Sequence, residues 1–178
     1  MDTFGLRPPP LTLILGFHLT VLICDPMHAL HLGVFQWIVA SVMVLLAEAG
    51  EWGVYRGERI VRLNNALRRA YRHFKEWCRQ HGINTSQECF TAASTGRAED
   101  AHSFPQFKGK AANTGRVIEW LHAVYDAKGQ RCLITCLLWG CCEMIAVMRD
   151  HKGPFLSADA ARRFAHGGHS ALVVSKMT

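Results

Sequence analysis

The residues with the clearest chemical potential are Asp25, His28 and His31, which follow one another at intervals of three. Asp25 ends an apolar run and precedes another, Val34–Leu46. A carboxylate at the end of a strand, with a helix behind it, is a common position for a divalent-metal ligand in phosphoryl-transfer enzymes. Spaced by three on a helix, the side chains share one broad face and can also bind a transition metal. The alternative is structural, with Asp25 as a helix cap and His28 hydrogen-bonded in the core.

The elements that position these residues are predicted from hydrophobic patterning. Residues 11–24 contain several β-branched side chains and predict one or two strands. A helical body then covers residues 26–150, with a loop at 82–108, and residues 151–178 form a short helix and a frayed tail. The predicted helices are 34–49, 58–80, 110–127, 130–149 and 157–165, the last ended by Gly167 and Gly168. The predicted fold class is therefore mostly α with one or two N-terminal strands, in a single domain. We expect this domain to be a fragment of a larger one, because one or two strands alone leave backbone hydrogen-bonding groups unpaired at their edges.

A basic face accompanies the amphipathic helix predicted at 58–80. Its apolar residues recur at steps of three and four, which indicates one buried stripe. The other faces are rich in cations, and the candidate nucleic-acid contacts are Arg62, Arg68, Arg69, Arg72 and Lys75. Arginine suits bidentate phosphate binding, so DNA is one predicted partner. The alternative is a solvated face over a core helix.

Composition narrows the function classes. A formal net charge of +6 and a pI of about 9.1 favour an anionic partner. The seven cysteines are odd in number and lack zinc-site spacing, which predicts free thiols in an intracellular, reducing compartment. The N-terminus lacks signal-peptide features, and the apolar run Val34–Ala47 is short for a membrane span, so we expect no membrane association. The motifs of nucleotide cofactors are missing from the sequence, and no small-molecule cofactor is expected.

Two short motifs resemble those of a known protein family. The string Asp25-Pro26-Met27-His28, followed by Leu32-Gly33, resembles a signature of CACTA-type (En/Spm-like) DNA transposases. The stretch 107–116 is similar to a later Lys-Ala-x-Glu-x-Arg block of the same family. The resemblance spans about residues 17–150. It implies a partial RNase H-like α/β core with a helical insertion between the two motifs.

The resemblance also implies roles for individual residues. In that family, three carboxylates hold two Mg²⁺ or Mn²⁺ ions. Asp25 matches the second carboxylate, with His28 beside it, and the third carboxylate position falls at Asn113, which is an amide. One acid of three remains, so the resemblance implies a transposon-derived, catalytically inactive nuclear protein that retains DNA or partner binding. Self-association is a further prediction, because a fragment with unpaired strand edges should associate. A metal is expected only if the site is active. The alternative is a small helical scaffold or interaction protein with no nucleic-acid role.

Overall fold

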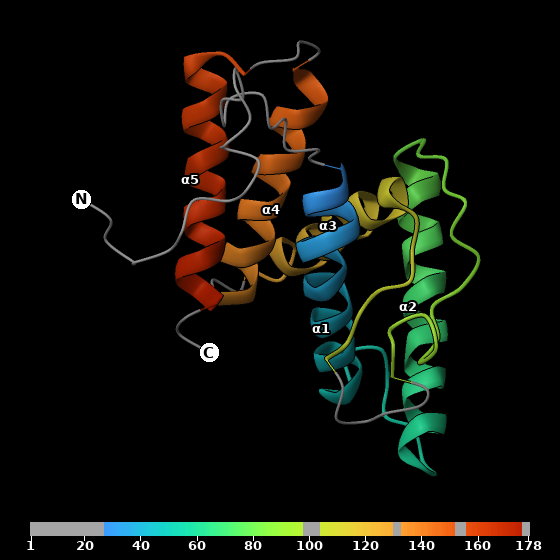
Figure 1. Ribbon diagram of the computed structural model, residues 1–178. Helices are drawn as coiled ribbons and strands as arrows, with labels where there is room; N and C mark the ends of the chain where they lie inside the picture. The colour runs from blue at the N-terminus through green and yellow to red at the C-terminus, as the bar shows by residue number, and fades with distance from the viewer. Residues whose placement is uncertain (1–26, 98–103, 130–132, 152–155, 176–178) are drawn as a thin grey trace, which may run out of the picture.

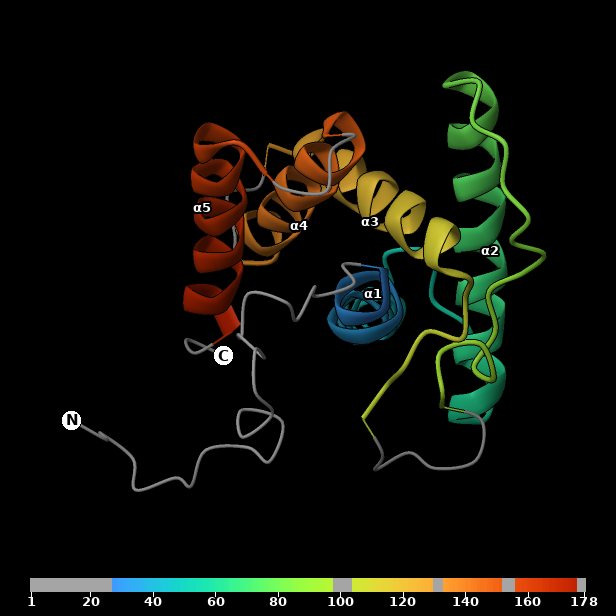
Figure 2. The same ribbon diagram turned by 45° about the horizontal axis from the view of Figure 1, so that its top comes forward.

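Helices form the whole regular structure of the described chain in a computed structural model (Figure 1). The structure describes residues 27–97, 104–129, 133–151 and 156–175. Its elements are η3 (Met27–Val34), α1 (Phe35–Glu48), α2 (Arg59–Gln80), α3 (Ala111–Asp126), α4 (Leu133–Asp150) and α5 (Ala158–Ser175). In both views α2 and α5 lie on opposite sides, with α1, α3 and α4 between them (Figures 1 and 2).

The predicted fold class is wrong in its α/β part. The described residues contain no strand and no sheet, so they form no RNase H-like core. The strands predicted at 11–24 lie outside the described residues. In an α/β core, helices would pack on a sheet. Here the helices bury their apolar surface against one another, and α1 lies at the centre of the packing (Figure 2).

The central helix α1 is apolar on most of its circumference. Phe35, Val39, Ala40 and Met43 are fully buried, which is typical of a core helix covered by several neighbours. By length and composition, His28–Glu48 is also the described segment that could cross a membrane: an 18-residue window within it has a mean hydropathy of 2.0, and 44% of that window is buried in the fold. The membrane prediction stays a prediction.

Aromatic side chains join α2, α3 and the long loop. Trp120 of α3 is fully buried, and its ring lies 5.5 Å from Phe74 of α2 and 5.9 Å from Phe90 of the loop. Its indole N–H donates to Nδ1 of His73, at 2.9 Å. On another side, Trp52 stacks on Trp120 with ring centroids 6.0 Å apart. These contacts place α2 against the core by one edge and leave its opposite edge in solvent.

The loop predicted at 82–108 has no helix in its described residues, 82–97 and 104–108. Phe90 and Phe107 are fully buried and anchor it to the core. The backbone N–H of Phe107 donates to the Gln36 carbonyl at 3.0 Å. The side chain of Gln36, which is 7% exposed, also holds this segment, because its amide donates to the Gly109 carbonyl at 3.0 Å. The loop is therefore packed structure, despite its polar sequence.

The last helix, α5, continues through the two glycines that were predicted to end it. Gly167 is buried against α4, where a Cβ would lie 2.8 Å from the carbonyl oxygen of Gly140. These glycines therefore serve close helix packing rather than chain termination, and the helix runs to Ser175. The prediction failed because a glycine pair is a local stop signal that tertiary contacts can override.

Gly167→Ala and Gly168→Ala test this packing as a matched pair. At Gly167 the added methyl meets backbone, so the helices must separate and we expect the free energy of unfolding to fall by about 1–3 kcal/mol. At Gly168 the nearest atom is Sδ of Met144 at 3.6 Å, an ordinary contact, and we expect a gain of up to about 1 kcal/mol. Urea unfolding measures both. Equal effects of the two changes would contradict the close approach of α4 and α5.

Candidate nucleic-acid interface

The Asp-x-x-His motif is only partly described by the structure. Asp25 lies outside the described residues, so its predicted metal or capping role stays a prediction. His28 is exposed in η3. This helical segment is interrupted at Gly33, whose φ and ψ of −106° and −110° are not helical. Within the described residues, no group of three or more His, Cys, Asp or Glu side chains is placed to hold a metal ion.

His31 of η3 packs against α1 and α3. Its ring meets Phe35 edge-on at 5.4 Å, and a Cβ at Gly115 would lie 2.9 Å from its Cε1. Burial lowers the pKa of His31, against smaller opposing contributions from the Ala111 backbone and the Glu119 carboxylate. Its Nδ1 is buried and has no hydrogen-bond partner among the described residues. These properties are those of a packing histidine that is held neutral.

Asn113 lies at the start of α3 and is 5% exposed. Its Oδ1 accepts a hydrogen bond from Oγ1 of Thr85 at 3.2 Å, and its Nδ2 donates to Oγ of Ser86 at 3.2 Å and to Oε1 of Gln87 at 3.4 Å. The amide therefore uses both its acceptor and its donor to hold the loop against α3. A carboxylate cannot donate in this way. The structure brings η3 beside α3 through His31 and Gly115, two residues beyond Asn113.

The cysteines do not form a reactive cluster in the described chain. Burial raises the pKa of Cys141 to about 12, and burial with nearby acidic groups raises that of Cys142 to about 12. Both are free thiols. A thiol is a nucleophile or metal ligand only as its thiolate, so these two side chains serve packing.

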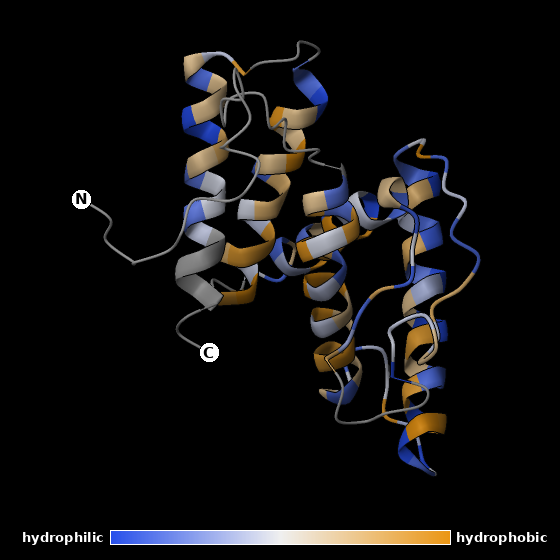
Figure 3. Ribbon diagram, viewed as in Figure 1, coloured by the Kyte–Doolittle hydropathy of each residue, from blue (hydrophilic) through white to orange (hydrophobic). Residues whose placement is uncertain are grey.

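The basic face of α2 is exposed as predicted. Figure 3 shows hydrophilic and hydrophobic residues along the length of this helix. Leu63, Leu67, Ala70 and Phe74 are buried at steps of three and four. All the predicted contact residues, Arg62, Arg68, Arg69, Arg72 and Lys75, are exposed. With Arg79 they fall within an arc of about 140° around the helix axis.

Few acidic groups neutralise this face. Seven of the 22 residues of α2 are Arg or Lys and one is Glu, a formal charge of +6 that equals the charge of the whole chain. That acid, Glu76, accepts hydrogen bonds from Arg79 at 2.9 and 2.6 Å and from Gln80, which lower its pKa to about 2. Arg59 pairs with Glu48 of α1. The remaining cations of the face have no ion pair within the described part of the chain.

Sequence reasoning missed one row of residues on this helix. Arg69, His73 and Trp77 follow each other at steps of four, so they share the edge where the basic face meets the core. The spacing was visible in the sequence. The signal was hidden because Trp77 was counted with the apolar stripe and Arg69 with the basic face, while His73 was assigned to neither. The orientation of His73 depends on the Trp120 contact.

Comparisons with known proteins identify no relative of this chain. No protein-family model, curated protein or solved structure matches this chain. The fold and the candidate site together define the class: in its described residues this is a helical protein with one strongly basic, exposed helix. The resemblance to CACTA-type transposases stays a prediction.

His31 predicts a pH dependence of stability. Because its pKa is lowered in the folded state, the unfolded chain binds more protons below about pH 6.5, and stability falls as the pH drops through that region. We expect His31→Phe to lose less stability between about pH 7.5 and about pH 5 than the unchanged protein, measured by urea unfolding. His169→Phe, on exposed α5, is the control and should retain the full loss. An unchanged pH dependence in His31→Phe would contradict the assignment.

Asn113→Asp tests the role of the amide. The change replaces a donor with an acceptor facing Ser86 and Gln87, so we expect the free energy of unfolding to fall by about 1–3 kcal/mol. Asn65→Asp is the control, since Asn65 is half-buried on α2 and should change stability little. Both are measured with and without magnesium chloride. Recovery of the Asn113→Asp variant in magnesium would indicate a metal site instead of a structural amide.

Proposed function

We propose that this protein binds nucleic acid through the exposed face of α2. The observation that carries the proposal is the concentration of charge, because α2 alone holds a formal charge equal to that of the entire chain. A solvated helix face usually mixes both signs of charge at intervals of three and four. On α2 a single acid, Glu76, lies at that spacing from Arg72 and Arg79 and pairs with Arg79, and the other cations of this face have no acid at that spacing within the helix.

The spacing of the cations suits a phosphate backbone. Arg68, Arg72, Lys75 and Arg79 form one row, at steps of four, three and four, that covers about 16 Å of helix. Arginine forks bind phosphate oxygens in bidentate fashion, while lysine contributes a point charge. Contacts of this kind supply affinity and register without reading sequence. The proposed binding is therefore electrostatic and tolerant of sequence.

The resemblance to CACTA-type transposases points to the same ligand. Those enzymes act on DNA, and a protein derived from one would keep DNA as its partner and the nucleus as its compartment. The role of Asn113 supports binding rather than strand cleavage, because its amide is committed to the loop at 85–87. The proposed activity uses no Mg²⁺ or Mn²⁺, since the phosphates are met by side chains.

A second candidate function, self-association, has an observation of its own. Trp37 and Leu45 on the outside of α1, and Val34 at the end of η3, are more than half exposed. The ring of Trp37 lies 6.4 Å from that of Phe104, which is 81% exposed. A second copy of the chain would bury this apolar surface. This function does not use α2, so charge reversal on α2 separates the two candidates.

Arg68→Glu/Arg72→Glu tests the proposed binding. We expect the affinity for a labelled duplex to fall at least tenfold at low salt, because two attractive charges become repulsive. The slope of log K against log salt should become shallower by about two, since each lost phosphate contact removes close to one unit. Fluorescence anisotropy across a salt series measures both quantities.

Arg162→Glu/Arg163→Glu on α5 is the matched control. It makes the same change in net charge on the opposite side of the molecule, at exposed residues whose ion pairs contribute little to stability (Figure 1). We expect it to leave the salt slope unchanged. If both double variants weaken binding equally, net charge rather than the α2 face determines affinity, and the proposal fails.

A further inference from the structure

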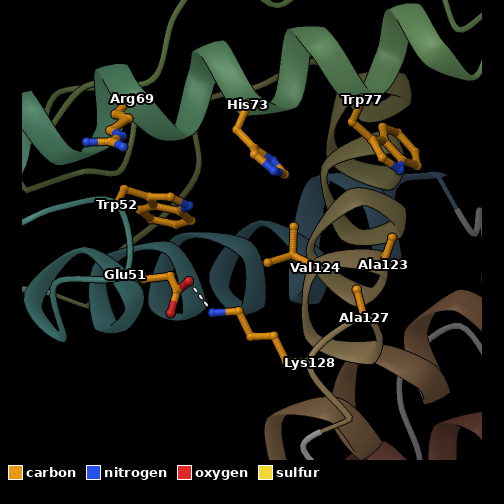
Figure 4. Close-up of a pocket in the computed structure, with 9 residues that line it drawn as sticks. All are labelled: Glu51, Trp52, Arg69, His73, Trp77, Ala123, Val124, Ala127 and Lys128. Carbon is orange, nitrogen blue, oxygen red and sulfur yellow. Dashed lines mark hydrogen bonds and ion pairs between the residues drawn. The ribbon is translucent and has the colours of Figure 1, made fainter.

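A pocket of 470 Å³ lies between α2, α3 and the turn after α1 (Figure 4). This volume is within the usual range for small-ligand sites. Three aromatic residues line it: Trp52 from the turn, and His73 and Trp77 from α2. Val124 of α3 projects toward the centre of the view, between the two indoles. The pocket therefore offers apolar and aromatic walls on the same edge of α2 that adjoins the basic face.

His73 presents a hydrogen-bond donor at this pocket. An indole N–H only donates, so Nδ1 of His73 must accept from Trp120 and carries no proton in this arrangement. The proton of the neutral ring is therefore on Nε2. His73 is exposed, and Nε2 has no partner within the described chain. Its donor is therefore available to a ligand in the pocket that His73 lines.

Two cations and one carboxylate are among the residues that line the pocket. Arg69 lines the pocket from α2, and Lys128 lines it from the end of α3, paired with Glu51. A shallow depression on the surface of α2, lined by Arg69, Arg72, His73 and Glu76, shares Arg69 and His73 with the pocket. The positive surface of the helix is thus continuous with the aromatic cavity. A ligand that fits both is flat and aromatic at one end and anionic at the other.

We propose that this pocket receives an unpaired base of a single-stranded nucleic acid, while the adjoining phosphates bind Arg69 and Arg72. The inference rests on the proposed function and adds a preference for single strands to it. Bases in a duplex are stacked and paired, so they cannot reach a cavity lined by protein rings without leaving the helix. Unpaired bases pack on aromatic side chains, histidine included, with little dependence on sequence. Base oxygens and ring nitrogens can accept from Nε2 of His73.

Filling the pocket tests the proposal without removing a charge. Ala127, the exposed residue that caps the end of α3, lines the pocket, whereas Ala112 is exposed at the start of the same helix. We expect Ala127→Phe to lower the ratio of single-strand to duplex affinity about tenfold, the size of one lost base contact. Ala112→Phe should leave the ratio unchanged. The probes are a dye-labelled oligothymidylate of about eight nucleotides, within the usual site size, and a duplex of equal length.

A second measurement separates the base from the phosphate. For the unchanged protein, an abasic oligonucleotide of the same length should bind about tenfold more weakly than oligothymidylate, at the level that oligothymidylate shows with Ala127→Phe. Oligouridylate should bind about as well as oligothymidylate if the base alone is recognised. Equal affinity for the abasic and thymidine strands would overturn the proposal. So would competition by thymidine monophosphate as strong as that of the strand, which would make this a free-nucleotide site.

The outcomes distinguish this inference from the function on which it rests. If duplex binding depends on Arg68 and Arg72 but pocket filling changes nothing, the basic face is real and the base site is wrong. If strand binding depends on the base and on Ala127→Phe while Arg68→Glu/Arg72→Glu has no effect, the base pocket survives, but the phosphate contact of Arg72 and the proposed function of the α2 face both fail.

Discussion

The hydrogen bond from the buried indole of Trp120 to His73 is the interaction on which the rest of the structure depends. Trp120 is fully buried, and a buried indole N–H without a partner costs about 1–3 kcal/mol. The acceptor comes from another helix, so α3 and α2 are fixed in register at that point. Trp52 and Phe90 pack around the same indole from the turn and the loop. One side chain thereby joins four segments and determines which edge of α2 faces solvent.

Much of the helical framework was predictable because its patterning is local. The apolar stripe of α2 predicted residues 58–80, and the helix runs from Arg59 to Gln80. The boundaries of α1 and α3 also agree to within about one residue. The α/β core was not predictable in this way, since it came from a resemblance between short motifs, and the described residues contain no strand. The length of α5 failed for a tertiary reason, because Gly167 is used against Gly140.

The candidate site shows a sharper division. The exposure of the basic residues on α2 follows from the helical period, so the sequence was sufficient to predict it. The role of Asn113 was not predictable, since its partners, Thr85 to Gln87, come from a loop without periodic pattern. The same holds for the aromatic pocket, whose members lie on three separate segments. Long-range neighbours of this kind emerge only from the packed structure.

The contacts of Gln36 have a consequence for how the chain folds. Its amide donates to the carbonyl of Gly109, a residue 73 positions later in the sequence. Pairings of such long range form late, because loop closure costs entropy before any contact compensates for it. The amphipathic α2 needs only local contacts to begin forming. During synthesis the cationic helix would therefore emerge well before the segment that completes its support, and an early polyanion could act as a temporary partner for it.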